Sequence, residues 1–413
     1  MSDHLNQKPK VLIVTASSWF PTARLAMALA HAGCTVDAIC PAGHPLRKSR
    51  AVSKTYFYRG LAPLGSLAHA IAETQPDLIV PGDDLATSQL HQLHSRDGGR
   101  GEVSQLIERS LGTSESFPVV YARTRFIELA VEEGVRAPRT EVVAGPQALQ
   151  QWISRLGFPF VLKANGTSGG DGVRVVHTLE AAQRALRELQ APPKLARAVK
   201  RALVDHDKTL LWPSLLRRQF VVNAQEFVAG REATSAVACW RGAVLASLHF
   251  EVINKRDSAG PSSVVRLVEN SEMSFAAEKM VRRLNLSGLH GFDFMLEART
   301  GNAHLIEINP RATQVGHLAL GPGRDLPAAL YAALSGQALH AAPKVTENDV
   351  IALFPQEWLR DPQSPFLRTA YHDVPWHESE FLRACVRLRQ KKSAGSSEQE
   401  LLQTLEAVRL SQL

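Results

Sequence analysis

The beginning of the chain alternates between short apolar runs and longer amphipathic stretches. This alternation predicts strands at 10–15, 36–40 and 77–81, with helices at 21–33 and 64–75 between them. Strands that alternate with helices form a parallel sheet with helices on its faces. The sequence therefore predicts an α/β fold for this first part of the chain.

The loops that follow the predicted strands carry polar residues that a ligand could contact. Ligands of parallel sheets bind beyond the carboxyl ends of the strands, which nominates Ser17, Ser18, Trp19, Asp83 and Asp84. An equal alternative is that these are ordinary loop residues. The turn after the first strand contains no glycine, so the Gly-x-Gly-x-x-Gly dinucleotide fingerprint is absent. A nicotinamide-dependent dehydrogenase is therefore disfavoured.

The pattern of predicted elements changes in the second part of the chain. A short helix is expected at 123–134, and from about residue 158 strands joined by glycine-rich turns predominate, with helices between them. Breaks in the pattern divide the chain into three parts, 1–116, 117–344 and 345–413. In the last part, 391–399 is polar and small and predicts a flexible linker before an amphipathic helix at 400–411.

The composition is that of a folded protein of enzyme size. The length of 413 residues suggests two or three domains, and the 45% hydrophobic and 21% charged residues exclude disorder as the dominant state. The net charge of +7 is compatible with nucleic acid, a membrane surface or a phosphorylated small molecule as partner. The sequence has no apolar run of 18 residues, no signal segment and no Cys-x-x-Cys pair. A cytoplasmic protein without a membrane span or zinc site is expected.

A glycine-rich loop interrupts two predicted strands within 159–176. The first strand ends at Lys163, and Gly166, Gly169, Gly170 and Gly172 follow before the second strand begins. Glycines let backbone N–H groups approach phosphate oxygens closely, and Lys163 adds a positive charge. No Gly-Lys-Ser/Thr closes the loop, so it is not a P-loop but resembles a flap between antiparallel strands. A glycine-rich hairpin with a surface lysine is the alternative.

Two predicted strands within 291–311 flank an Arg-Thr-Gly turn and form a hairpin. Aligning their apolar faces pairs Phe292 with Ile308 and Phe294 with Ile306, which places Asp293 opposite Glu307. Two carboxylates about 5 Å apart repel by roughly 3 kcal/mol at an effective dielectric near 20. A cation between them, or protonation of one, relieves this. With Asn309 on the same face, the oxygen ligands suit Mg²⁺; a solvated acidic face is the alternative.

Together, these stretches resemble the ATP-grasp superfamily, in the subset that includes biotin carboxylase, carbamoyl-phosphate synthase and related carboxylate–amine ligases. The resemblance runs from about 118 to 340, and the Glu-Ile-Asn-Pro-Arg at 307–311 is its most specific piece. It implies a Rossmann-like domain at 1–116 followed by an ATP-grasp fold, two α+β subdomains that grip ATP, with a lid at about 155–230. The tail from 345 to 413 does not match.

The resemblance also implies site roles and cofactors. ATP and Mg²⁺, with Mn²⁺ as an alternative, are the expected cofactors. The metal would be held by Asp293, Glu307 and Asn309. Phosphate would be bound by Lys163, Arg125, Gly169, Gly170 and Gly172. Adenine would lie against Glu226, Phe227 and Val228, and Glu232 would reach the ribose. Arg311 would hold an acyl phosphate or the acceptor.

The family's chemistry is phosphoryl transfer to a substrate carboxylate followed by attack of an amine, so small-molecule carboxylate and amine substrates are expected. Two segments are candidates for a mobile lid, the flap at 166–172 and the polar, turn-rich segment 254–266. In the second, the candidate substrate contacts are Lys255, Arg256, Ser262, Ser263 and Arg266, with an ordinary surface loop as an equal alternative for each. His317 lies near the end of the site, and a structural role is the alternative for this histidine. The alternatives are a carboxylase or carbamoyl-type enzyme of the same fold and a non-catalytic nucleotide-binding protein. A nucleic-acid-binding protein is disfavoured, because aromatics make up only 6% and no such motif is present.

Most of the charge excess lies between residues 184 and 218. This segment has nine basic and three acidic side chains, so it accounts for six of the seven net charges. Its pattern predicts helix, and a solvated helix face, a docking surface for an anionic partner and a subunit contact in a homo-oligomer are all compatible with it.

Overall fold

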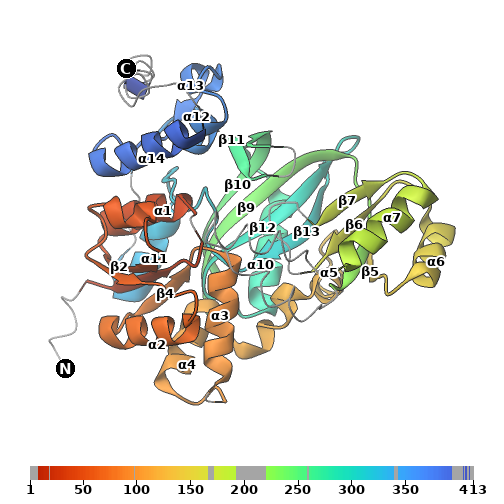
Figure 1. Ribbon diagram of the computed structural model, residues 1–413, viewed down its shortest axis with the longest axis horizontal. Helices are drawn as coiled ribbons and strands as arrows, with labels where there is room; N and C mark the ends of the chain where they lie inside the picture. The colour runs from red at the N-terminus through yellow and green to blue at the C-terminus, as the bar shows by residue number, and fades with distance from the viewer. Residues whose placement is uncertain are drawn as a thin grey trace.

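The computed structural model describes residues 8–392 apart from 18, 97, 166–171, 192–219, 258–259 and 339–342, together with 403, 405, 406 and 409. Over this range the chain forms three β-sheets with helices packed on them. A parallel sheet lies at one end of the molecule, the largest sheet in the middle and a small sheet at the other end (Figure 1). The mixed α/β and α+β organisation expected from the sequence is confirmed.

Some predicted features fall outside the described residues. These are Ser18, the loop glycines Gly166, Gly169 and Gly170, and the part of the basic segment from 192 to 218. The same holds for the linker from 393 onward and most of the expected terminal helix.

The N-terminal sheet is parallel, as the alternating pattern predicts, with strand order β3-β2-β1-β4. Its strands are β1 (Lys10–Val14), β2 (Thr35–Cys40), β3 (Lys54–Phe57) and β4 (Leu78–Pro81). The sequence pattern missed β3, because this short edge strand buries only one of its side chains. The helices of this region are α1 (Pro21–His31), α2 (Pro63–Thr74), α3 (Asp84–Ser95) and α4 (Glu102–Leu111), with short 3₁₀ turns η2 (Pro45–Lys48), η3 (Ser114–Ser116) and η4 (Val119–Tyr121).

The central sheet has seven strands in the order β13-β12-β9-β10-β11-β14-β15. They are β9 (Gly230–Trp240), β10 (Ala243–Lys255), β11 (Ser262–Leu267), β12 (Gly288–Glu297), β13 (Ala303–Asn309), β14 (Val350–Ala352) and β15 (Tyr371–His372). Helices α10 (Ser271–Arg283) and α11 (Leu326–Ser335) pack against β9 and β10. All pairings except β14 with β15 are antiparallel.

The small sheet has the order β5-β8-β6-β7 and carries the predicted flap hairpin. Its strands are β5 (Thr140–Val142), β6 (Phe160–Ala164), β7 (Val173–Val176) and β8 (Val222–Glu226), covered by α6 (Pro146–Leu156) and α7 (Leu179–Gln190). Helix α5 (Arg123–Glu132) connects this sheet to the central one. One face of β6 packs Phe160 and Leu162 against the helices, so Lys163 points from the opposite face.

The segment after residue 345 extends the central sheet. Strand β14 pairs with β11, and β15 adds to β14 in parallel. Helices α12 (Gln356–Arg360), α13 (Phe366–Thr369) and α14 (Ser379–Lys392) follow, and α14 contacts the N-terminal region at η2. Glu378 accepts hydrogen bonds from Ser49 Oγ (3.1 Å) and Arg50 N (3.0 Å). The C-terminal segment therefore ties the central sheet to the N-terminal region.

The apolar cores show which parts of the molecule form one body. Leu25 of α1, Phe250 of β10, Leu330 of α11, Trp358 of α12 and Phe381 of α14 all belong to one continuous core. The small sheet instead has a core of its own, between its strands and α6 and α7. The small sheet is thus a separately packed lobe, while the parallel and central sheets are fused.

A buried carboxylate, Asp373, joins three distant segments. It accepts from His317 Nε2 (2.6 Å), Arg24 Nη2 (3.4 Å) and the backbone N of Phe354 (2.5 Å). Burial would raise the pKa of Asp373, but Arg24 and His317 outweigh it and hold the pKa below the usual range. His317, considered above as a site residue, therefore serves in this structure as a buried partner of Asp373.

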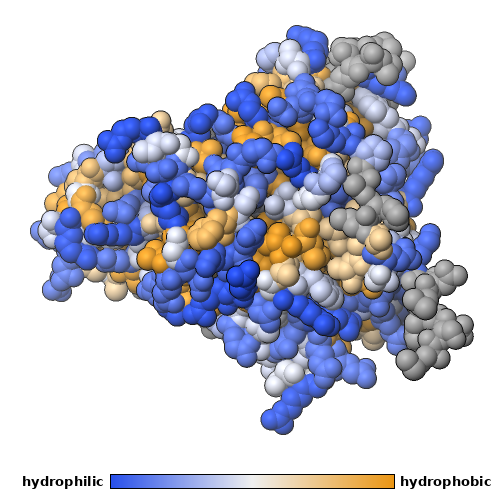
Figure 2. All heavy atoms as spheres, turned by 180° about the vertical axis from the view of Figure 1, so that it is seen from behind, coloured by the Kyte–Doolittle hydropathy of each residue, from blue (hydrophilic) through white to orange (hydrophobic). Residues whose placement is uncertain are grey.

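The surface is mostly polar. On the face opposite to that of Figure 1, hydrophilic side chains cover most of the molecule, with apolar side chains gathered near its middle (Figure 2). Among the helices that the structure describes, none is both long and apolar enough to cross a bilayer.

We predict that His372→Phe reduces the acid sensitivity of the fold. His372 is buried against Phe354 (ring centroids 5.6 Å), and neither ring nitrogen has a hydrogen-bond partner among the described residues. Burial lowers the pKa of His372 to about 4. When the pH falls below about 6.5, the usual pKa of histidine, His372 becomes protonated in the unfolded chain but stays neutral in the folded one. The free energy of unfolding therefore falls as the pH drops from 6.5 towards 4.

Urea unfolding at pH 7.5 and 5.5 measures this effect. The loss of unfolding free energy between the two pH values should be about 1.4 kcal/mol smaller for the variant than for the wild type. Any packing cost of the phenylalanine is the same at both pH values and cancels. An equal loss in both proteins would contradict the prediction.

Candidate functional site

The predicted carboxylate pair lies at the edge of the central sheet. Asp293 of β12 is directly opposite Glu307 of β13, and Phe292 pairs with Ile308, as the apolar alignment predicted. The further pairing of Phe294 with Ile306 was wrong: Phe294 pairs with Leu305, because a bulge follows Asp293. The bulge inserts Ile306 as an extra residue and leaves the two carboxylates in register.

Asp293 is held by neutral hydrogen-bond donors. Thr234 Oγ1 donates to one carboxylate oxygen (2.9 Å) and Asn309 Nδ2 to the other (2.9 Å). Burial and the neighbouring charge of Glu307 nevertheless raise the pKa of Asp293 to about 6. The position therefore disfavours a second negative charge unless a cation joins it.

Glu307 is paired with a cation that sequence reasoning missed. Arg123, the first residue of α5, places Nε 3.2 Å and Nη2 3.1 Å from Glu307 Oε2. Its Nη1 donates to the backbone O of Ala164 (2.6 Å) on β6. Burial would raise the pKa of Glu307, but Arg123 and Lys163 outweigh it and lower the pKa. Arg123 thus joins the central sheet to the small sheet across the site.

Lys163 faces the same space from the small sheet. It is only 7% exposed, and burial lowers the pKa of its ammonium to about 8, although the charges of Glu307 and Asp293 oppose the shift. On the neighbouring strand Asn223 accepts from Thr124 Oγ1 (2.7 Å) and donates to Asn165 (2.7 Å). These hydrogen bonds hold α5 against β8 and against the end of β6, the strand that carries Lys163.

Arg125, the cation that the sequence assigned to this helix, does not lie with the carboxylates. Its side chain is 49% exposed and pairs with Glu128 and Glu132, both at 3.2 Å. One helical turn carries both arginines, and only tertiary packing distinguishes the face of Arg123 from that of Arg125. The structure therefore places Arg123 beside the carboxylate pair and Arg125 in exposed ion pairs of its own helix.

The residues expected to contact adenine and ribose lie where β8 leads into β9. Glu226 accepts from the backbone N of Arg139 (2.9 Å), and Phe227 is 39% exposed. Val228 is half-buried, and Glu232 of β9 accepts from Lys255 Nζ (2.7 Å). Glu232 also acts electrostatically on Lys163, so it lies on the side of β9 that faces the site.

Arg311 follows the carboxylate strand and reaches the N-terminal region. Its Nε donates to Asp84 (3.0 Å) and its Nη2 to Asn309 Oδ1 (3.3 Å). The loop after Arg311 packs closely on β12: a Cβ on Gly291 would lie 2.3 Å from Thr313 Cγ2, so only glycine fits at this position. The carboxyl edge of the parallel sheet and the carboxylate pair thus meet at Arg311.

Of the other nominated residues, the two serines are buried and the two arginines are exposed. Ser262 binds the Gln314 amide through its backbone O (2.8 Å), and Ser263 is fully buried. Arg256 pairs with Asp257, and Arg266 pairs in register with Val350 and is exposed. Gly172 leads into β7, directly after the undescribed part of the flap.

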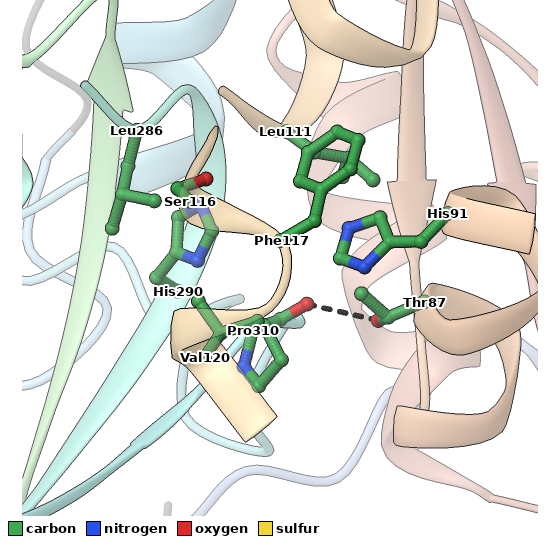
Figure 3. Close-up of a pocket in the computed structure, with 9 residues that line it drawn as sticks. All are labelled: Thr87, His91, Leu111, Ser116, Phe117, Val120, Leu286, His290 and Pro310. Atoms are coloured by element: carbon green, nitrogen blue, oxygen red, sulfur yellow. Dashed lines mark hydrogen bonds between the residues drawn. The ribbon is translucent and has the colours of Figure 1, made fainter. Parts of the chain in front are cut away.

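A void of about 10 Å³ lies behind Pro310, the residue before Arg311 (Figure 3). Thr87 Oγ1 donates to the Pro310 carbonyl (2.9 Å), and His91 stacks on Phe117 with ring centroids 3.7 Å apart. This space accommodates about one water molecule and no substrate. It belongs to the packing that holds Pro310, and therefore Arg311, in place.

The donor set suits a magnesium ion. Among the described residues, no three His, Cys, Asp or Glu side chains form a closed metal cage. The candidate oxygen ligands are the opposed carboxylates of Asp293 and Glu307 and the amide oxygen of Asn309, which accepts from Arg311. Mg²⁺ usually takes one or two carboxylates from the protein and completes its octahedron with phosphate and water. The residues present therefore fit Mg²⁺ bound together with a phosphorylated ligand.

Comparison with known proteins agrees with this geometry. A family model described as an ATP-grasp domain matches residues 210–315. The carbamoyl phosphate synthase large chain of Pasteurella multocida (strain Pm70) is 22% identical over 236 residues, which are 56% of this chain and 20% of the relative. The arginine-specific large chain of Bacillus subtilis (strain 168) is 25% identical over 214 residues, 49% of this chain and 18% of the relative. The chain thus spans about a fifth of these relatives.

Solved structures agree as well. The biotin carboxylase domain of Hydrogenobacter thermophilus 2-oxoglutarate carboxylase, in complex with MgADP and bicarbonate, matches with a TM-score of 0.56 at 15% identity, covering 81% of this chain and 71% of that one. N5-carboxyaminoimidazole ribonucleotide synthetase from Thermus thermophilus matches with a TM-score of 0.57 at 17% identity, covering 81% and 80%. The chain has the ATP-grasp fold, and the resemblance found in its sequence is confirmed.

We predict that Asp293→Asn stabilises the protein when no metal is present. The substitution removes one of two opposed carboxylates, keeps an oxygen that can accept from Asn309 Nδ2, and adds an NH₂ group that can donate to the Thr234 hydroxyl. In EDTA the unfolding temperature should rise by about 2 °C. Added Mg²⁺ and ADP should raise the unfolding temperature of the wild type more than that of the variant.

Differential scanning calorimetry with and without Mg²⁺ and ADP measures both effects. Glu297→Gln, which removes a carboxylate at the far end of β12, is the matched control and should leave the gain from Mg²⁺ and ADP unchanged. A lower unfolding temperature of Asp293→Asn in EDTA, or a gain equal to that of the wild type, would contradict a cation site here.

Proposed function

We propose that this protein is an ATP-dependent ligase that activates a small carboxylate as an acyl phosphate and joins it to an amine. The observation that carries the proposal is the meeting of the Asp293–Glu307 pair with Lys163 and Arg123 between two sheets. Two opposed carboxylates beside two cations, one of which already pairs with Glu307, form a site for a metal-bound phosphate chain. The fold and the ATP-grasp family model support the same activity.

The proposed reaction has two steps. A carboxylate oxygen of the substrate attacks the γ-phosphorus of ATP, the bond to the β–γ bridging oxygen breaks, and ADP leaves. An amine nitrogen then attacks the acyl carbon, the bond between this carbon and the phosphate oxygen breaks, phosphate leaves, and the nitrogen loses a proton. Such a reaction requires positioning and charge neutralisation more than a protein nucleophile.

Each part of the site has a role in this proposal. Asp293, Glu307 and Asn309 hold Mg²⁺, which neutralises phosphate charge when bound. Lys163 and Arg123 contact the phosphates, and their burial strengthens the interaction because the surrounding dielectric is low. Arg311 holds the carboxylate that is phosphorylated. Adenine lies against Glu226, Phe227 and Val228, with Glu232 near the ribose.

The separately packed small sheet supports a closing step. Polar contacts, Arg123 to Ala164 and Thr124 to Asn223, join it to the rest, while its apolar core is independent. Polar contacts of this kind can rearrange without exposing a core. Closure would exclude water, which otherwise hydrolyses an acyl phosphate.

A second candidate keeps the fold and changes the acceptor. The relatives are large chains of carbamoyl phosphate synthase, and the solved structures include biotin carboxylase domains, so carboxylation or carbamoyl-type chemistry is the alternative. ADP release that requires bicarbonate would favour it over the ligase. A homo-oligomer, a cytoplasmic location and Mn²⁺ as a substitute for Mg²⁺ remain predictions from the sequence.

We predict that Arg123→Gln weakens ATP binding while Arg125→Gln does not. A charge-assisted hydrogen bond contributes about 1.5–3 kcal/mol, so the dissociation constant of ATP should rise about tenfold or more in Arg123→Gln. Among the described residues, Arg125 pairs only with exposed glutamates of its own helix, and its loss should change the constant less than about twofold. Isothermal titration with MgATP measures both. Equal effects of the two substitutions would contradict the assignment of Arg123.

We predict that Glu307→Gln abolishes ADP release without unfolding the protein. The glutamine keeps a hydrogen-bond acceptor for Arg123 but removes the charge that the metal requires. The assay screens carboxylates and amines singly and in pairs, measures ADP and determines the product mass. Circular dichroism confirms the fold of the variant. ATP binding without ADP release from any pair by the wild type would instead favour a non-catalytic nucleotide-binding protein.

A further inference from the structure

Two adjacent aspartates at the start of α3 differ sharply in their surroundings. Asp83 Oδ2 accepts from Thr15 Oγ1 (2.7 Å), Ala16 N (2.8 Å) and both donors of Ser17 (3.1 Å each), and its Oδ1 accepts from Ala86 N (2.9 Å). Its carboxylate is fully used in closing the loop after β1. The Asp84 carboxylate has one hydrogen-bond partner among the described residues, the Nε of Arg311.

The Asp84–Arg311 pair is accessible from the site. The side chain of Asp84 is 37% exposed and that of Arg311 is 19% exposed. Arg311 also donates to Asn309, one of the proposed metal ligands, so the pair borders the place where a phosphate would be transferred. It lies beyond the carboxyl end of β4, where parallel sheets bind ligands.

The pair is not needed to attach the N-terminal region to this loop. Two uncharged contacts already do so: Thr87 Oγ1 donates to the Pro310 carbonyl (2.9 Å), and the backbone N of Ala312 donates to the Pro81 carbonyl (3.1 Å). A large shared core also fuses the two regions. An additional, partly exposed ion pair contributes little to stability. Its chemistry is therefore available for a ligand.

The charges around the pair define the ligand. Asp84 and Arg311 balance each other, so a plain carboxylate on Arg311 leaves the Asp84 charge without a partner. A ligand with both a carboxylate and an ammonium group replaces the pair with two ion pairs and conserves charge. The charge of Asp84 also acts on Tyr121, whose hydroxyl is buried and has no hydrogen-bond partner among the described residues.

We propose that the carboxylate substrate is an amino acid, bound with its carboxylate on Arg311 and its ammonium on Asp84. This inference rests on the proposed function and names the class of its substrate. Asp84 stabilises the protonated ammonium, which has no lone pair and cannot attack. The amino group of this substrate is therefore what the protein recognises, and the nucleophile is the amine of the second substrate.

Binding without turnover tests the inference. Isothermal titration with the common α- and β-amino acids, and with the matching acids that lack the amino group, is carried out on the wild type. At least one amino acid should bind about tenfold or more tightly than its des-amino counterpart. Binding of no amino acid, or equal binding of both forms, would overturn the proposal.

A substitution separates recognition from positioning. Asp84→Asn keeps an oxygen for Arg311 but removes the charge, so the affinity for the amino acid should fall about tenfold while that for the des-amino acid changes less than about twofold. Glu141→Gln, in an exposed ion pair with Arg155 on the small sheet, is the matched control and should change neither. Equal losses for both ligands in Asp84→Asn would show a role in positioning Arg311 only and would overturn the proposal.

The inference and the proposed function can fail separately. An amino acid that binds through Asp84 but gives no ADP with any amine would refute the ligase and leave the binding site intact. ADP release with acids that lack an amino group, at rates equal to those with amino acids, would refute the substrate class and support the ligase.

Discussion

Two carboxylates forced together across a strand pair are the constraint around which this molecule is organised. Asp293 and Glu307 are in register because the apolar side chains on the other face of β12 and β13 must reach the same core. Burying them costs free energy that no neutral neighbour recovers, and the pKa of Asp293 rises to about 6 in consequence. Three cations surround the pair and stabilise its negative charge: Arg123, Lys163 and Arg311.

Arg123 connects this constraint to the architecture. It binds Glu307 on the central sheet and the Ala164 carbonyl on the small sheet, so one positively charged side chain of the site connects the two lobes. The lobes have separate cores. A ligand that competes for Glu307 would therefore act on the contact between the lobes as well as on the site, which links binding to closure in physical terms.

A buried charged cluster around Asp373 supports the loop that follows Arg311. Asp373 of the C-terminal segment binds Arg24 of α1 and His317 of the loop after Arg311, and the same segment adds β14 and β15 to the central sheet. Removing one partner of such a buried group leaves an unpaired charge at a cost of about 3–5 kcal/mol. The segment from 345 onward is thus part of the framework that positions Arg311.

Local pattern sufficed for some features of this protein. Alternation of apolar residues predicted the parallel sheet, the flap hairpin and the opposition of Asp293 and Glu307, because strand periodicity and register follow from neighbouring residues. Tertiary packing decided the rest. The helix pattern could not separate Arg123 from Arg125, the bulge at Ile306 leaves no local signal, and the pairing of β14 with β11 joins residues far apart in the chain. Likewise, only the meeting of α3 with the loop after β13 gives Asp84 its partner, since an ion pair between distant segments depends on how the sheets are stacked.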